Sequence, residues 1–380
     1  MSVPQAKQMR RAYGFDEVAI VPGDTTINPA MTEIALRIGE LEFALPIMAA
    51  AMDAVVDAKL AASFSKLGGL AVLNLEGVQT RYDDPDAVLE EMAHASPEEA
   101  TALLQRLYAA PIRPDLIGER IRQVKEAGGV AAVSCTPMNT KKFAPFAKEA
   151  GADVFVVQST VTTARHISYS EKGLVLAELV QRMAPTPVLV GNTVSYNGCR
   201  ELMETGVAGV LVGVGPGSAC TSREVLGIGV PQVTSTMDCA AARDQYYRES
   251  GRYVPIITDG GIRSGGDMCK AFAAGADAIM LGSILAACAE APGRGHHWGM
   301  AAPHADLPRG VRVRVGVTTT LNQVLFGPSS RTDGTENFVG ALRTSMGMVG
   351  ARTIRDFQQA GLVIAPSIKT EGKQIQRAQS

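Results

Sequence analysis

Short apolar segments recur along the 380-residue chain, each followed by small or polar residues, and amphipathic stretches separate them. Continuous apolar runs joined by helices are typical of buried parallel strands with crossover helices. Eight such units predict an α/β fold, a closed (β/α)₈ TIM barrel that forms one domain over residues 1–380. The segments are 45–49, 70–74, 130–134, 154–158, 187–191, 209–213, 255–260 and 278–282, and helices are expected at 57–68, 140–151, 195–206 and 266–275.

Three regions depart from this repeat. Residues 76–128 join the second and third strands through polar helical sequence that is longer than a crossover needs, which predicts a short helical insert. Residues 290–340, rich in Gly, Pro, His and Arg, follow the eighth strand without steady periodicity and are expected to form an active-site flap. A final helix is expected over 340–361, before a C-terminal tail at 362–380.

Charge and hydropathy exclude several classes of protein. Lys and Arg number 36 against 38 acidic residues, so no positive field favours nucleic acid or an anionic membrane, and a small-molecule partner is expected. No apolar run is long enough to span a membrane, and the N-terminal sequence does not match a secretory signal. The six cysteines lack C-x-x-C pairing, which predicts reduced thiols in the cytoplasm.

The carboxyl ends of the last two barrel strands carry glycines. The seventh strand ends in Asp259, Gly260 and Gly261, and the eighth in Gly282 and Ser283. Barrel enzymes often hold a phosphate at this place, because backbone N–H groups without a nearby Cβ can approach an anion. These residues therefore predict a phosphate site, with Asp259 bound to ribose hydroxyls. The alternative is that the glycines only form tight turns.

The loop after the sixth strand, GVGPGSACTSR (213–223), contains Cys220. It does not match a dinucleotide-binding fingerprint, since its third glycine comes too early and no Rossmann unit surrounds it. A thiol in a polar loop beside a phosphate site is well placed for nucleophilic attack, with Arg223 available to stabilise the thiolate. The alternative, a buried cysteine without a role, is the better interpretation for most of the other five.

The segments GVGPGSACTSREVLGIGVPQ (213–232) and TDGGIRSGGDMCKAFAAGADAIMLGS (258–283) resemble the IMP dehydrogenase and GMP reductase family. The similarity extends from YGFDEVAIVPG (13–23) to VGALRTSMGMVGA (339–351) and covers nearly the whole barrel. Most IMP dehydrogenases carry CBS modules between strands two and three, where this chain has only the insert at 76–128. The chain is therefore similar to a compact, CBS-less branch of the dehydrogenases.

This resemblance implies that Cys220 attacks C2 of IMP, that hydride passes to NAD, and that water releases XMP. Ser222 would lie near that water, and Arg309 stands where relatives have Glu or Gln. The implied nucleotide-binding residues are Ala50, Met52, Ser218, Asp259, Gly260, Gly261, Gly282, Ser283, His297, Gly299 and Met300. The implied cofactor-binding residues are Gln158, Ser159, Thr160, Gly213 and Gly215. Potassium would be held by Gly215, Gly217 and Cys220, with Glu371 and Gly372 from a neighbouring subunit of a homotetramer or octamer.

Some positions depart from the family pattern. Gln158 replaces a cofactor-binding Asp, Ala50 a Ser and His297 a Tyr, and residues 299–310 are too few to include the Arg-Tyr pair that activates water. Arg309, Arg312 and Arg314 are the candidates for that role. Two alternatives follow, an NADPH-dependent GMP reductase and a catalytically silent purine-nucleotide-binding regulator. The sequences VPQ (230–232) and GSILAA (282–287) and Pro303 favour the dehydrogenase over the reductase, and Cys220 argues against the silent regulator.

Overall fold

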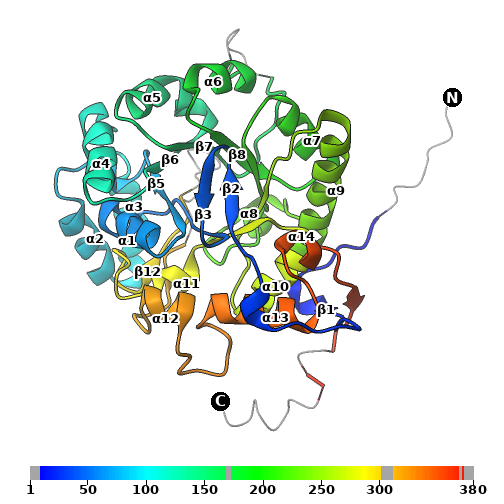
Figure 1. Ribbon diagram of the computed structural model, residues 1–380. Coiled ribbons are helices and arrows are strands. Elements are labelled where there is room, and N and C mark those ends of the chain that lie inside the picture. Colours follow the sequence, from blue (N-terminus) through cyan, green and yellow to red (C-terminus); the bar gives the residue numbers. More distant parts are fainter. Residues whose placement is uncertain (1–8, 168–172, 301–310, 368–369, 372–380) are drawn as a thin grey trace, which may run out of the picture.

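Eight parallel strands close into a barrel in the computed structural model, which describes residues 9–167, 173–300, 311–367 and 370–371 (Figure 1). The order around the barrel is β10-β11-β4-β5-β6-β7-β8-β9. Each strand lies on one of the eight apolar segments, so the predicted (β/α)₈ TIM barrel is confirmed. The strands are β4 (Ile47–Ala49), β5 (Leu70–Asn74), β6 (Ala132–Cys135), β7 (Val154–Gln158), β8 (Val188–Thr193), β9 (Gly209–Val212), β10 (Ile256–Asp259) and β11 (Ala278–Leu281).

Side chains along each strand alternate between the barrel interior and the surrounding helices, as the pleat requires. In β7, Val154 and Val156 belong to the interior cluster, whereas Phe155 and Val157 pack in the cluster shared with the helices. Because both faces are buried, the strands are continuous apolar runs rather than alternating ones. Their apolar character is therefore explained by the two layers that cover them.

An antiparallel hairpin, β2 (Leu36–Ile38) and β3 (Leu41–Phe43), lies over the amino-terminal end of the barrel, at its centre in Figure 1. Leu36, Ile38 and Phe43 are buried in the same cluster as the interior residues of the strands. The hairpin therefore closes one end of the barrel. The candidate site lies at the opposite end of the barrel, at the carboxyl ends of the strands.

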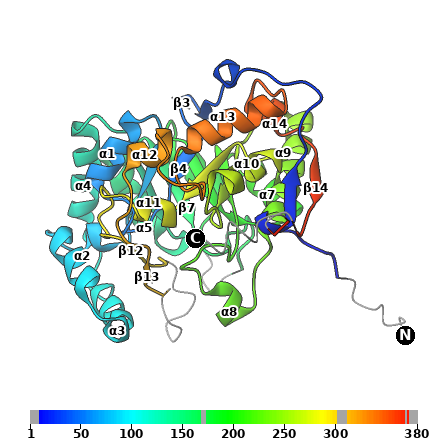
Figure 2. The same ribbon diagram turned by 90° about the horizontal axis from the view of Figure 1, so that it is seen from below.

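Helices surround the barrel (Figures 1 and 2). The expected helices at 57–68, 140–151, 195–206 and 266–275 correspond to α1, α5, α7 and α10. The helices are α1 (Ala58–Lys66), α2 (Pro85–His94), α3 (Pro97–Leu107), α4 (Pro114–Glu126), α5 (Pro137–Glu149), α6 (Leu176–Met183), α7 (Tyr196–Glu204), α8 (Ser222–Leu226), α9 (Gln232–Ser250), α10 (Gly265–Ala273), α11 (Ser283–Ala286), α12 (Leu321–Phe326), α13 (Phe338–Met348) and α14 (Ile354–Phe357).

Residues 76–128 contain three helices, of which α4 packs against α1 and α5 as a crossover helix of the barrel. The other two, α2 and α3, form a helical hairpin at the barrel edge (Figure 2). A separate apolar cluster joins this hairpin to the segment after β11. In it, Met92, Leu104 and Leu107 of the hairpin pack with Trp298. The added structure in this chain is therefore the α2–α3 hairpin.

The region after β11 contains a short antiparallel pair, β12 (His296–His297) with β13 (Val313–Arg314), and then α12. Between the two strands, residues 301–310 lie outside the described residues. His297 pairs with Val313 and His296 with Arg314. This pairing holds together the described segments on the two sides of residues 301–310.

The prediction of a single helix over 340–361 is wrong, because the structure has two helices there, α13 and α14. Gly350 has φ +74° and ends the first helix, while the side chain of Thr353 caps the second through the N–H of Asp356. The tail begins with a strand, β14 (Leu362–Ile364), which pairs antiparallel with β1 (Val18–Ile20). Among the described residues, no helix combines the length and apolar character needed to cross a membrane.

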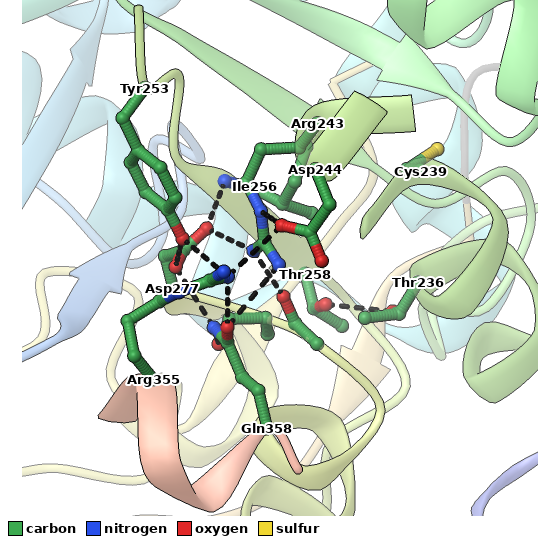
Figure 3. A network of polar contacts seen from close by, with 12 residues as sticks. Thr236, Cys239, Arg243, Asp244, Tyr253, Ile256, Thr258, Asp277, Arg355 and Gln358 are labelled. Atoms are coloured by element: carbon green, nitrogen blue, oxygen red, sulfur yellow. Dashed lines mark hydrogen bonds and ion pairs between the residues drawn. The ribbon is translucent and has the colours of Figure 1, made fainter. Parts of the chain in front are cut away.

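A buried polar network joins α9 to the loop before β11 and to α14 (Figure 3). The Arg243 guanidinium, 1% exposed, donates to Asp277 Oδ2 at 2.7 Å and to the carbonyl of Gly275 at 2.7 Å. Asp277 also accepts from the Tyr253 hydroxyl at 2.5 Å and from Gln358 Nε2 at 2.9 Å. A buried charge is tolerated only when it is paired in this way.

Candidate active site

A cavity of about 600 Å³ opens at the carboxyl ends of the strands, between the loop after β9 and the segments after β10 and β11. Every residue that the sequence assigned to nucleotide binding lines it. They are Ala50, Met52, Ser218, Asp259, Gly260, Gly261, Gly282, Ser283, His297, Gly299 and Met300. Cys220, Ser222 and Gly217 also line the cavity, which brings the candidate nucleophile into the same space.

The part of the cavity suited to an anion lies between three loops. Gly260 and Gly261 have φ of +85° and +79°, a conformation that glycine adopts without strain. The hydroxyls of Ser218 and Ser283 are 2.6 Å apart, although they follow different strands. Hydroxyl groups and unshielded backbone at one place are typical of phosphate sites.

Cys220 differs from the other five cysteines, all of which are buried without a disulfide. Its thiol is partly exposed in the cavity and lies 3.4 Å from the Ser222 hydroxyl, while its backbone N–H donates to the Gly217 carbonyl at 3.0 Å. Burial raises the pKa of Cys269 and of Cys288 to about 12, so those thiols stay protonated. Cys220 is thus the thiol that a bound molecule can reach.

Asp259 is placed at the end of β10 by a set of amide donors. Its Oδ2 accepts from Gln158 Nε2 at 2.9 Å and from Asn192 Nδ2 at 2.8 Å, and its carbonyl accepts from Gln232 Nε2 at 2.9 Å. Burial raises the pKa of this carboxyl to about 6, against the lowering effect of the two amides. The group is therefore ionised at neutral pH and fixed in one orientation.

Asn192 and Gln232 were missed by the sequence analysis. Asn192 ends the apolar segment of β8, and Gln232 closes the VPQ motif at the start of α9. The position of Asn192 directly after the apolar segment 187–191, near the carboxyl end of β8, was the available signal, since strand ends carry active-site residues in this fold. The Gln232 side chain donates to the carbonyls of Val212 and Asp259, at the ends of the neighbouring strands β9 and β10, and the sequence holds no local signal for this contact.

His297 is 1% exposed, lines the cavity, and has no hydrogen-bond partner within the described structure at either ring nitrogen. Burial, together with the neighbouring His296, lowers its pKa to about 4. The imidazole is therefore neutral at pH 7, with one nitrogen that donates and one that accepts. Polar groups that are buried without a partner in an unliganded cavity are suited to bind a ligand.

We predict that His297 makes folding sensitive to acid. Between pH 6.5 and 4 the unfolded chain takes up a proton on this residue while the folded chain does not, so stability falls as the pH falls. Relative to a His297→Phe variant, the wild type should lose about 2–3 kcal/mol of unfolding free energy between pH 7 and 4.5. Urea unfolding at several pH values measures this difference.

The exposed His94 supplies the control for this experiment. Its replacement by Phe should leave the pH profile parallel to that of the wild type. Equal pH profiles for the wild type and the His297→Phe variant would show that His297 titrates as an exposed histidine does, and would contradict the prediction.

The residues assigned to the cofactor do not line this cavity. Gln158 contacts Asp259 and Asn192, and Ser159 Oγ bonds to the carbonyl of Val161 and the hydroxyl of Thr162. Thr160 lies in the same loop after β7. A Cβ on Gly213 would approach the carbonyl of Asp259 to 2.3 Å, so this glycine lets two neighbouring strand ends come together.

Four of the five residues assigned to potassium lie in the described part of the chain. Gly215, Gly217 and Cys220 lie on one loop, with the Gly217 carbonyl already accepting the Cys220 N–H, and Glu371 lies in an exposed turn. Gly372 and the candidate base Arg309 fall outside the described residues. No cluster of three His, Cys, Asp or Glu side chains that suits a metal ion occurs in the described ranges.

The two other arginines considered for water activation do not line the cavity, whereas Val313 and Val315 do. The Arg312 guanidinium instead donates to the carbonyls of Met92 and Ala95, at the end of α2, at 2.5 and 2.8 Å. Arg314 is exposed. Arg312 is therefore a structural residue here.

Residues 12–373 match the model of the IMP dehydrogenase / GMP reductase domain. The chain is 40% identical over 373 residues to an uncharacterized oxidoreductase of Mycolicibacterium smegmatis, covering 96% of this chain and 99% of the relative. It is 27% identical to an inosine-5'-monophosphate dehydrogenase of Rhizobium tropici, over 92% of this chain and 90% of that protein. The crystal structure of an IMP dehydrogenase/GMP reductase-like protein from Corynebacterium glutamicum superposes with a TM-score of 0.89 at 36% identity, covering 96% and 97% of the two chains.

Proposed function

Because the chain belongs to the IMP dehydrogenase / GMP reductase family of oxidoreductases, we propose that it oxidises IMP to XMP with NAD, in guanine nucleotide synthesis. The supporting observation is that one cavity brings the Cys220 thiol together with the two serine hydroxyls and the glycine pair of the anion site. A nucleoside monophosphate bound there by its phosphate would extend toward the thiol. A cavity of this size accommodates such a ligand.

In this proposal Cys220 does the covalent chemistry. Its thiolate adds to C2 of the purine, and the hydride that leaves C2 is accepted by NAD when that cofactor is bound. Water then adds to C2, the C–S bond breaks, and XMP leaves with the thiol restored. The Ser222 hydroxyl, 3.4 Å from the sulfur, is suited to hold that water beside C2.

The remaining cavity residues would orient the nucleotide. Ser218, Ser283 and the backbone at Gly261 and Gly282 bind the phosphate, and the ionised Asp259 accepts from the ribose hydroxyls. The amides of Gln158 and Asn192 keep the Asp259 carboxylate facing the sugar. His297 supplies a neutral donor at the wall formed by β12.

The group that activates water is proposed to be Arg309, on the strength of its position in the family pattern alone. A guanidinium acts as a base only where neighbours make its deprotonated form accessible. The engagement of Arg312 with α2 removes it from consideration. NAD binding by the loop that carries Gln158, Ser159 and Thr160 and by Gly213 and Gly215, and potassium binding by the Cys220 loop in a tetramer or octamer, belong to the same proposal.

A second function, reduction of GMP to IMP with NADPH, is favoured by one observation. Among the described residues that line the cavity, no arginine is paired with a tyrosine. Reduction of GMP releases ammonia and needs no activated water, so this site would serve it without a further base.

The two functions differ in their products, which gives a direct assay. We predict that the purified protein forms NADH from IMP and NAD in potassium buffer, followed at 340 nm, and does not consume NADPH with GMP. Replacement of potassium by sodium should lower the rate, because a carbonyl site selects by ion size. Consumption of NADPH with release of ammonia from GMP would establish the second function, and nucleotide binding without either reaction would leave a silent binding protein.

A further inference from the structure

A buried polar chain connects the α2–α3 hairpin to the cavity wall. The Tyr108 hydroxyl, directly after α3, donates to Asp53 Oδ2 at 2.5 Å and accepts from Trp298 Nε1 at 2.8 Å. The same hydroxyl lies 3.5 Å from Met300 Sδ. Tyr108 is 8% exposed, while Asp53 and Trp298 are 0% and 1% exposed. The Tyr108 hydroxyl thus contacts three groups from two other segments, the loop after β4 and the segment after β11.

Each residue bound by Tyr108 adjoins residues that line the cavity. Asp53 follows Met52 and also accepts the Val78 N–H at 2.8 Å, so the loop after β4 is fixed at this point. Trp298 lies between His297 and Gly299, and Met300 lines the cavity itself. A shift of the Tyr108 hydroxyl would therefore move the cavity wall from two directions.

The hairpin holds the same wall at two further places. Arg312 binds the carbonyls at the end of α2, and the next residue, Val313, pairs with His297 and lines the cavity. Arg294 forms an ion pair with Glu90 of α2 at 3.2 Å. The chain is thereby attached to α2 just before each strand of the β12–β13 pair, so the position of the hairpin bears on the position of the pair.

We propose that Tyr108 is a positioning residue for the nucleotide cavity, through which the α2–α3 hairpin sets the placement of Met52, His297 and Met300. This inference rests on the proposed function, because it takes a purine nucleotide as the ligand whose affinity the wall controls. Tyr108 does not touch that ligand. Its effect passes through the Asp53 carboxylate and the Trp298 indole.

Tyr108→Phe tests the proposal, with Tyr82→Phe as the matched control. Tyr82 belongs to the same apolar cluster, and its hydroxyl donates to the carbonyl of Leu107 at 2.9 Å without meeting the cavity wall. Trp298 is the sole tryptophan of the chain, so its fluorescence reports IMP and GMP titrations directly. The measurements are the dissociation constant, the KM and kcat for the reaction, and the melting temperature.

Tyr108→Phe should raise the dissociation constant and KM for the nucleotide by about fivefold to tenfold, with a smaller change in kcat, as expected when one buried hydrogen-bonded group is lost from a binding wall. It should also shift the Trp298 emission in the free protein, because the indole loses its acceptor. Tyr82→Phe should lower the melting temperature to a similar extent but leave the dissociation constant and the emission unchanged.

Equal nucleotide affinity in the wild type and Tyr108→Phe would overturn the proposal, as would an equal loss of affinity in both variants, since that marks a general effect of destabilising the hairpin. If Tyr108→Phe is poorly folded, Arg312→Gln provides the second test, because it releases β13 from α2 without altering the buried chain. It should weaken nucleotide binding to a comparable degree, and unchanged affinity would again count against the proposal. A wild type that binds neither IMP nor GMP would instead refute the proposed function.

Discussion

Replacement of Cys220 by alanine is expected to abolish NADH formation from IMP, with a fall in kcat of at least about a thousandfold. The reason is that the covalent step of the proposed mechanism depends on this sulfur, and loss of a nucleophile from a covalent mechanism commonly costs several orders of magnitude. Among the six cysteines, Cys220 alone combines exposure to the cavity with a place beside the Ser218–Ser283 pair. Stopped assays with IMP and NAD over long incubation measure the residual rate.

Nucleotide affinity gives the control for the Cys220 variant. The proposed phosphate and ribose contacts do not use the sulfur, so Trp298 fluorescence should show IMP binding within a few fold of the wild type. Cys288→Ala is the matched variant, because Cys288 is buried behind the cavity and burial raises the pKa of its thiol to about 12. Substantial turnover by Cys220→Ala would exclude the covalent mechanism.

Arg243→Ala is expected to lower the free energy of unfolding by about 3–5 kcal/mol, because it leaves the Asp277 carboxylate buried without its main charged partner. The Arg243 guanidinium also satisfies the Gly275 carbonyl and contacts Asp244 and Gln358. Figure 3 shows that Tyr253, Arg355 and Gln358 surround the pair from other elements, so the carboxylate stays largely buried in the variant. Urea unfolding at pH 7 measures the loss.

The exposed pair Arg37–Glu42 provides the comparison. With side chains 80% and 55% exposed, this pair is expected to contribute less than about 1 kcal/mol, so Arg37→Ala should be nearly neutral. An equal loss of unfolding free energy in Arg243→Ala and Arg37→Ala would contradict the prediction. It would mean that the buried network stabilises the fold no more than an exposed ion pair does.

The barrel could be predicted from the sequence because its strands are buried on both faces. Each strand is then a continuous apolar run, and the order of the β/α units along the chain gives their order around the barrel. Strand ends also predicted the lining of the cavity, since Asp259 ends β10 and Gly261 and Ser283 directly follow apolar segments. The features that the sequence predicted correctly therefore depend on residues that are close together in the chain.

Features that depend on contacts between distant segments were not predictable in this way. Gln232 joins the carbonyls at the ends of β9 and β10, and Tyr108 reaches Trp298 from the α2–α3 hairpin. The break between α13 and α14 was missed because the apolar spacing continues through it, although Gly350 and Thr353 carry the signals for a helix end and a helix start. The engagement of Arg312 with α2 follows only from the placement of the hairpin.

The pairing of β1 with β14 determines when the candidate site is completed during folding. Gly14, Phe15 and Asp16 line the cavity just before β1, and the carbonyl of Glu17 accepts the N–H of Ala365 just after β14. During synthesis the ribosome releases β1 before the barrel strands and β14 after all of them, and closing so long a loop is slow. A nascent chain therefore completes its barrel before it can fix this wall, and protease protection of residues 14–20 should appear last.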